Sequence, residues 1–117
     1  MGPPVVFIAA TDSQFDSAVK AEKFAREAGA EVLNPTVSLP CHLARCSYLP
    51  IELAMLEASD IMWLLPNSIG NSIVASCIHY ARAQHITIIL NGQELVEELN
   101  QYTSNKQILL GGWDEEG

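Results

Sequence analysis

Short hydrophobic segments alternate along the chain with longer segments that have helical periodicity. Val5–Ala10 is an uninterrupted apolar run, and Ile61–Leu65 is another. Runs of this length without polar interruption are typical of strands that are buried on both faces of a sheet. The predicted strands lie at 5–10, 31–34, 61–65, 86–90 and 107–110.

Small and apolar side chains recur at helical spacing between these strands. In the first helical segment, small or apolar residues recur at helical spacing, and Gly29 stands where a helix ends. These residues are Ala18, Ala21, Phe24, Ala25 and Ala28. Pro50 suits the first turn of the second helix. The predicted helices lie at 15–28, 50–59, 71–84 and 93–102. This alternation predicts an α/β fold, a three-layer sandwich with a parallel sheet and helices on both faces.

The length of 117 residues corresponds to one domain. We expect a single domain over residues 1–110 and an acidic tail at 111–117, whose Trp113 suggests packing against another surface. Residues 35–49 contain two prolines and two cysteines and are predicted to be irregular. Such a long connection in a small domain is usually functional or mobile.

Composition and charge exclude several classes of function. The chain is 49% hydrophobic and 17% charged, as expected of a globular protein. No apolar run approaches the roughly 18 residues that a membrane helix needs. The net charge of −8 argues against binding to a nucleic-acid backbone. We therefore expect a cytoplasmic protein that binds neither nucleic acids nor membranes.

The three cysteines form no recognisable metal or disulfide pattern. Cys41, Cys46 and Cys77 are odd in number, and their spacing matches no zinc motif. We expect free thiols and no metal site. Cys77 shares a helical stripe with Val74, Ile78 and Ala81. This stripe favours a small buried hydrophobic residue over a nucleophile at position 77.

In open parallel sheets, ligands bind at the loops that follow the carboxyl ends of the strands. The first such loop offers hydroxyl groups and backbone amides at the start of a helix, although capping of that helix by Asp12 or Ser13 is the other interpretation. Neither a P-loop nor a dinucleotide-binding glycine motif is present. The candidate ligand-binding residues of this loop are Ala10, Thr11, Asp12 and Ser13.

A second polar loop follows the third predicted strand. Its residues can hold a hydroxylated or anionic group, or they can form an ordinary turn with a helix cap. The candidates in this loop are Pro66, Asn67, Ser68, Gly70, Asn71 and Ser72. The region between the second strand and the second helix adds Asn34, Pro35 and Tyr48.

Glu52 lies in the first turn of the second predicted helix. In one interpretation its carboxylate faces the ligand, where it accepts hydrogen bonds from sugar hydroxyls or transfers protons. In the other it is a favourable charge at the positive end of a helix. The residue types alone leave both interpretations open.

Five segments stand in an order and spacing that are more specific together than any one of them alone. They are Val5–Ala10, Gly29–Pro35, Ile51–Asp60, Leu64–Pro66 and Ala81–Ala83. Over residues 5–90, this arrangement resembles the nucleoside 2-deoxyribosyltransferase superfamily. The best match is to a small, largely uncharacterised branch of that superfamily, common in bacteria and phages.

The resemblance implies a flavodoxin-like parallel sheet of four to five strands and assembly as a homo-oligomer, either a dimer or larger. Enzymes of the superfamily cleave or exchange the N-glycosidic bond of deoxynucleosides or their monophosphates with a nucleophilic glutamate, and no metal or organic cofactor is implied. An ungapped comparison places that glutamate at Cys77 and an earlier aspartate at Asn71. The acidic residue of the preceding helix falls on Glu52.

Replacement of the glutamate by Cys77 favours a relative that binds its ligand without the usual chemistry. We predict binding of a nucleoside or nucleotide derivative, which the protein would sequester or sense. The alternative is an active N-glycosidase or 2-deoxyribosyltransferase, with Glu52, or less favourably Cys77, as the catalytic group. A third hypothesis is a structural or interaction domain, motivated by the acidic tail and Trp113.

Overall fold

The computed structural model describes residues 3–39 and 45–102. Its four strands are β1 (Val5–Ala9), β2 (Glu31–Leu33), β3 (Ile61–Leu64) and β4 (Thr87–Ile89). All neighbouring strands pair in parallel, and the order across the sheet is β2-β1-β3-β4. The predicted α/β fold with a parallel sheet is confirmed.

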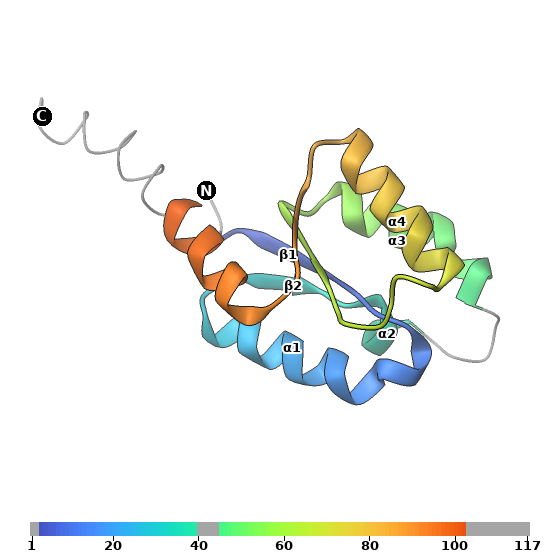
Figure 1. Ribbon diagram of the computed structural model, residues 1–117, viewed down its shortest axis with the longest axis horizontal. Helices are drawn as coiled ribbons and strands as arrows, with labels where there is room; N and C mark the ends of the chain where they lie inside the picture. The colour runs from blue at the N-terminus through green and yellow to red at the C-terminus, as the bar shows by residue number, and fades with distance from the viewer. Residues whose placement is uncertain (1–2, 40–44, 103–117) are drawn as a thin grey trace, which may run out of the picture.

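Helices cover both faces of this sheet (Figure 1). The longer helices are α1 (Phe15–Glu27), α3 (Leu49–Glu57), α4 (Ser72–Ala83) and a last helix at residues 92–102. α1 and the last helix pack on one face, and α3 and α4 pack on the other. The shorter elements are α2 (Pro35–Ser38) and the 3₁₀ turns η1 (Asp12–Gln14) and η2 (Arg45–Tyr48).

The uninterrupted apolar sequence of β1 follows from its position between the two helical layers. Val6 and Ile8 belong to the core cluster on the α1 face, whereas Phe7 and Ala9 belong to the cluster on the α3 and α4 face. Because successive side chains of a strand point to opposite faces, a strand covered on both sides needs apolar residues at every position. The same holds for β3, which is buried throughout.

Small side chains bring α1 close to the sheet. Ala18, Ala21 and Ala25 are buried in the core as the helical stripe predicted, whereas Phe24 and Ala28 of the same stripe are exposed. Beside them, Phe24 packs edge-on against Trp63, with ring centroids 5.9 Å apart. A Cβ atom on Gly92 would approach the Phe24 ring to 2.9 Å, so a residue without a side chain fits where the last helix begins.

The described parts of the segment at 35–49, residues 35–39 and 45–49, are more regular than the sequence predicted. Pro35 begins α2, and the backbone N–H groups of Val37 and Ser38 donate to the carbonyl of Asn34 at 3.1 and 2.9 Å. A helix of about one turn, such as α2, is too short to show a hydrophobic periodicity in the sequence. The following helix begins at Leu49, one residue before the predicted start. The predicted strand at 107–110, the acidic tail, Trp113 and Cys41 lie outside the described residues.

The strand order creates a switch point between β1 and β3. These neighbouring strands lead to helices on opposite faces of the sheet, since α1 follows β1 and α4 follows β3. In open parallel sheets, ligands bind beside the carboxyl ends of strands at such a point. We call residues 10–14 and 65–71, which follow β1 and β3, the switch-point loops. Within the described ranges, no helix is both long and apolar enough to span a bilayer.

Candidate functional site

The first switch-point loop is a compact turn whose polar groups bond to one another. The hydroxyls of Thr11 and Ser13 lie 2.9 Å apart, and the side-chain Oε1 of Gln14 accepts from the backbone N–H of Thr11 at 3.0 Å. Gln14 directly precedes α1, and its side chain makes no capping bond to that helix. The predicted capping of α1 by Asp12 or Ser13 is therefore wrong, because both residues lie in the preceding turn η1.

The second switch-point loop uses two of its predicted ligand-binding residues for its own structure. Ser68 is fully buried, and its hydroxyl donates to the carbonyl of Leu65 at 2.6 Å. The Oδ1 atom of Asn71 accepts from the backbone N–H groups of Ile73 and Val74 at 2.9 and 3.1 Å, as a helix cap does. The cap interpretation of Asn71 is therefore confirmed.

Other candidates in these loops remain at the surface. Asp12, Ser13, Pro66, Asn67, Gly70 and Ser72 are exposed, and Thr11 is half-buried, whereas Ala10 is buried. Asn67 has a φ of 66°, the left-handed backbone conformation of many turns, which asparagine adopts more readily than most residues other than glycine. The switch-point loops thus combine exposed polar groups with a constrained backbone.

Asn34 is directed into the protein rather than toward the switch-point loops. Its side-chain Nδ2 donates to the Ala18 carbonyl at 3.0 Å and to the Glu22 carboxylate at 3.1 Å. The residue is 1% exposed, and Pro35 after it is also buried. These bonds fasten the end of β2 to α1, so the donors of Asn34 are already used within the protein.

Tyr48 and Glu52 are buried one helical turn apart at the start of α3. Tyr48 is 8% exposed, and its hydroxyl has no hydrogen-bond partner among the described residues. Glu52 is 1% exposed. Both lie on the same helical face as Leu56, which belongs to the core cluster between α3, α4 and the sheet. Because α3 begins at the carboxyl end of the sheet, this pair lies at the edge where open parallel sheets generally bind ligands.

Cys77 is buried in the same layer, on α4. It is 2% exposed and shares a cluster with Phe7, Val74 and Ala81, as the helical stripe predicted. The position that the resemblance assigns to a nucleophile is therefore held by a small side chain packed in an apolar cluster.

Further along α3 and α4, desolvation and the neighbouring Glu57 carboxylate raise the pKa of Tyr80. In the described parts of the chain, no three His, Cys, Asp or Glu side chains gather to hold a metal ion.

Gln14 is a site residue that the sequence reasoning did not single out. Its Nε2 donates to the carbonyl of Pro66, so its side chain touches both switch-point loops. The spacing Thr11-x-x-Gln14 is that of a capping box, in which the fourth residue reaches back to the first. This spacing was the available signal for Gln14, although it does not predict the second bond to Pro66.

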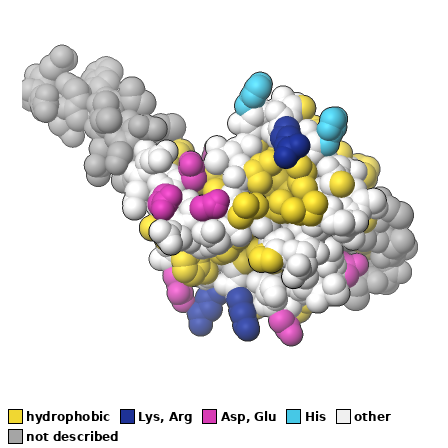
Figure 2. Space-filling view, viewed as in Figure 1, with side chains coloured by type: hydrophobic (Ala, Val, Ile, Leu, Met, Phe, Trp, Pro, Cys, Tyr) yellow, Lys and Arg dark blue, Asp and Glu magenta, His cyan; other side chains and the backbone are white. Residues whose placement is uncertain are grey.

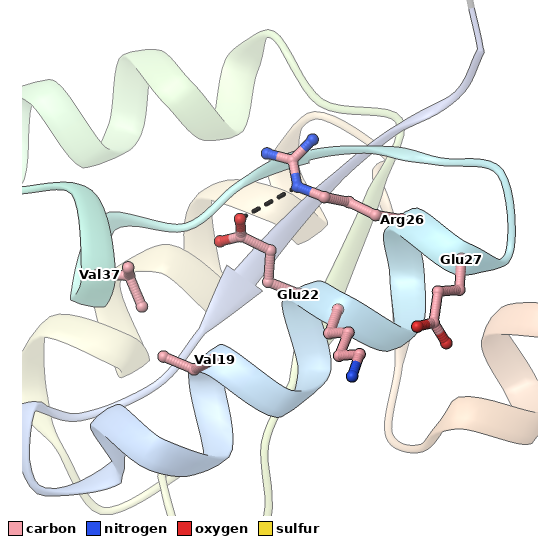
Figure 3. A pocket seen from close by; sticks show the side chains of 6 residues that line it. Val19, Glu22, Arg26, Glu27 and Val37 are labelled. Carbon is pink, nitrogen blue, oxygen red and sulfur yellow. Dashed lines mark hydrogen bonds and ion pairs between the residues drawn. The ribbon is translucent and has the colours of Figure 1, made fainter.

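A hollow lies away from the switch-point loops, and a larger one adjoins the second of them through Ile69. One, of about 310 Å³, runs along α1; Val19 and Val37 lie at one end of it and the Glu22–Arg26 ion pair lies beyond them (Figure 3). The other, of about 570 Å³, we call the edge groove. It is lined by Leu64, Ile69, Ala75, Ile78, Arg82, Ile88, Leu90 and Glu94. Figure 2 shows hydrophobic side chains gathered over this region.

The chain matches one protein family in sequence and one solved structure in fold. Residues 9–90 match a family described as a domain of unknown function, DUF4406. The fold is similar to that of a 2-deoxyribosyltransferase from the psychrotolerant bacterium Bacillus psychrosaccharolyticus, with a TM-score of 0.59 and 16% identity over 74% of this chain and 70% of that chain. Identity this low shows a shared fold, which is flavodoxin-like as expected. No curated protein matches the chain in sequence.

Proposed function

The chain belongs to the DUF4406 family, a domain of unknown function, and we propose that it binds a nucleoside or nucleotide derivative beside the switch-point loops. The observation that carries this proposal is the buried Tyr48 hydroxyl, which has no partner among the described residues. A buried hydroxyl without a hydrogen bond is costly, so its retention favours a ligand that supplies the bond. The likeness in fold to a 2-deoxyribosyltransferase suggests the ligand class.

Glu52 supports the same proposal from the next turn of α3. A carboxylate can stabilise the N-terminus of a helix electrostatically while it is exposed at the surface. Glu52 is only 1% exposed, so this role alone does not explain its burial. Removing a carboxylate from water is costly, which argues for a specific role of this side chain. In the proposal, Glu52 accepts hydrogen bonds from sugar hydroxyls of a ligand that enters between α3 and the switch-point loops.

Cys77 favours binding over catalysis. The resemblance assigns a nucleophilic glutamate to this position. The superfamily's enzymes use this glutamate to form a glycosyl ester, which a thiol cannot form. Cys77 is also packed among Phe7, Val74 and Ala81, away from solvent. We therefore propose that the domain holds its ligand, for sequestration or sensing, without cleaving it. The placement in a small bacterial and phage branch of the superfamily belongs to this proposal.

The alternative function is cleavage of an N-glycosidic bond by Glu52, and the buried carboxylate itself is what favours it. The two functions differ in the fate of the ligand. A binding protein returns the deoxynucleoside unchanged, whereas an N-glycosidase releases the free base. If the wild type releases free base and the Glu52→Gln variant does not, the enzymatic proposal replaces the binding proposal.

Calorimetric titration with the four 2′-deoxynucleosides and their 5′-monophosphates tests the proposal, with chromatography of each sample for free base. Tyr48→Phe removes only the hydroxyl, so we expect affinity to fall about 3- to 10-fold, the worth of one hydrogen bond. Stability should stay the same or rise, because the variant removes an unpaired buried polar group. Tyr80→Phe on α4 is the matched control and should bind as the wild type does. The proposal fails if none of the probes binds, or if Tyr48→Phe binds them all with unchanged affinity.

We also propose that the protein is a homo-oligomer whose subunits meet at the edge groove. Ile69 and Leu90, which line the groove, are 64% and 53% exposed, and β4 is the edge strand of the described sheet. Arg82 and Glu94 line the same groove, and neither forms an ion pair within the described ranges. A two-fold axis would bring Arg82 of each copy to Glu94 of the other, which favours a second copy as the occupant.

A further inference from the structure

Gln14 joins the two switch-point loops through both ends of its side-chain amide. Its Oε1 accepts from the backbone N–H of Thr11 at 3.0 Å, and its Nε2 donates to the backbone carbonyl of Pro66. The chemistry of the partners fixes the orientation of the amide, since an N–H can only donate and a carbonyl can only accept. One side chain therefore satisfies one backbone group in each loop.

The location of Gln14 gives this bridge its importance. Pairing between the β1 and β3 chains continues as far as the bond from the Leu65 N–H to the Ala9 carbonyl, at 3.1 Å. Beyond this bond the two chains separate toward helices on opposite faces of the sheet. The Gln14 side chain spans this separation, and it does so from the residue that directly precedes α1.

We infer that Gln14 is a positioning residue that holds the switch-point loops at the spacing that their ligand requires. The ligand in this inference is the one given by the proposed function. The role of Gln14 in holding the two loops does not depend on that function. Pro66 is followed by Asn67, whose φ of 66° turns the backbone within the second switch-point loop, so the bond from Gln14 holds this loop beside its turn. A loop that is ordered before binding loses less entropy when the ligand arrives, so the bridge raises affinity without touching the ligand.

Substitutions at position 14 can separate the two hydrogen bonds. Gln14→Glu keeps an acceptor for Thr11 but presents a carboxylate oxygen to the Pro66 carbonyl, where a donor is needed. Gln14→Met has a similar length and lacks both groups. Gln84, exposed after the end of α4, provides the matched controls Gln84→Glu and Gln84→Met.

Amide hydrogen exchange measured by NMR on the full chain tests the bridge without any ligand. In Gln14→Glu we expect the Thr11 amide to stay protected while the amides of 67–71 exchange about tenfold faster, the effect of one lost hydrogen bond. In Gln14→Met both loops should exchange faster, and neither Gln84 variant should change them. Unchanged exchange in both loops, or equal acceleration throughout the protein, would overturn the inference.

Binding provides the second readout, with 2′-deoxynucleoside 5′-monophosphates as probes. We expect Gln14→Glu to weaken the affinity of the wild-type ligand by several-fold, on the order of one hydrogen bond. Unchanged binding in a variant with freed loops would overturn the positioning role, and tighter binding would overturn it and indicate that Gln14 occupies the place of the ligand. If no probe binds the wild type, the proposed function fails, whereas the exchange data still decide whether Gln14 holds the loops.

Discussion

Burial separates the candidate residues into those that build the site and those that remain available to a ligand. The Ser68 hydroxyl bonds within the second switch-point loop, and the Asn71 side-chain oxygen caps α4. The side-chain N–H groups of Asn34 donate to α1. The Oδ1 of Asn34 is buried without a partner in the described structure, as is the Tyr48 hydroxyl, but the Asn34 side chain is held by the two bonds of its Nδ2, whereas the Tyr48 hydroxyl makes none. At the residue scale, the strongest functional signal is therefore an unused hydrogen-bonding group.

Glycines in this protein differ in what their backbone conformation requires. Gly29 ends α1 with a φ of +100°, whereas Gly70 has an ordinary φ, and neither would bring a Cβ into contact with other atoms. We expect Gly29→Ala to lower the free energy of unfolding by about 1–2 kcal/mol, because a side chain is strained in that conformation. Gly70→Ala is the control and should change it by less than about 1 kcal/mol. Urea denaturation of both variants checks this, and equal losses would contradict it.

Helix boundaries were predictable wherever a terminal residue has a specific role. Gly29 closes the first helix, and Asn71 caps the third predicted helix as expected. The start of the first helix at residue 15 was also predicted correctly, whereas its capping was not, because η1 intervenes between Thr11 and Phe15. The capping oxygens of Asp12 and Ser13 suit either a helix or a tight turn, and local sequence does not distinguish the two.

The cap of α4 contributes measurably to stability. Asn71→Ala leaves the N–H groups of Ile73 and Val74 without their acceptor, so we expect a loss of about 1 kcal/mol in the free energy of unfolding. Asn71→Asp should retain most of the stability, since aspartate also caps well. Ser72→Ala, one residue later on the exposed surface, is the control. Thermal and urea denaturation measure these differences; an Asn71→Ala protein as stable as the control would argue against the cap.

The arrangement of helices leaves one side of the molecule incompletely covered. The last helix packs with α1, so on the opposite face α4 stands next to β4 with the edge groove between them. Two of its large apolar side chains, Ile69 and Leu90, are more than half exposed. Exposed apolar surface that is rimmed by charged residues is typical of protein interfaces.

Self-association through the edge groove gives a prediction for the whole molecule. Ile69→Asp places a charge on an exposed loop residue, so we expect it to fold normally and to shift the protein toward monomer by at least tenfold in dissociation constant. Val19→Asp, on the exposed side of α1, is the control and should not change assembly. Sedimentation velocity over a wide range of concentrations measures this. Arg82→Glu and Glu94→Arg should each weaken assembly and together restore it; a wild type that stays monomeric contradicts the proposed interface.

The sequence by itself determined the layers and the main elements of this protein. Apolar runs such as Val5–Ala10 identified the buried strands, because a strand covered on both faces cannot contain polar residues. The helical stripes of Ala18–Ala25 and Val74–Ala81 identified the faces that meet the sheet. These features are local in sequence, so their physical causes can be read along the chain.

Only the tertiary structure decided which polar residues are buried and which distant residues they contact. Asn34 is held by α1, and Gln14 reaches Pro66, a residue 52 positions away. Tyr48 and Glu52 are buried because α3 lies against the sheet at that turn. Hydrogen bonds between distant segments depend on how the elements pack, and no local pattern encodes them. The side chains that most strongly suggest function here were therefore distinguishable only once the chain was folded.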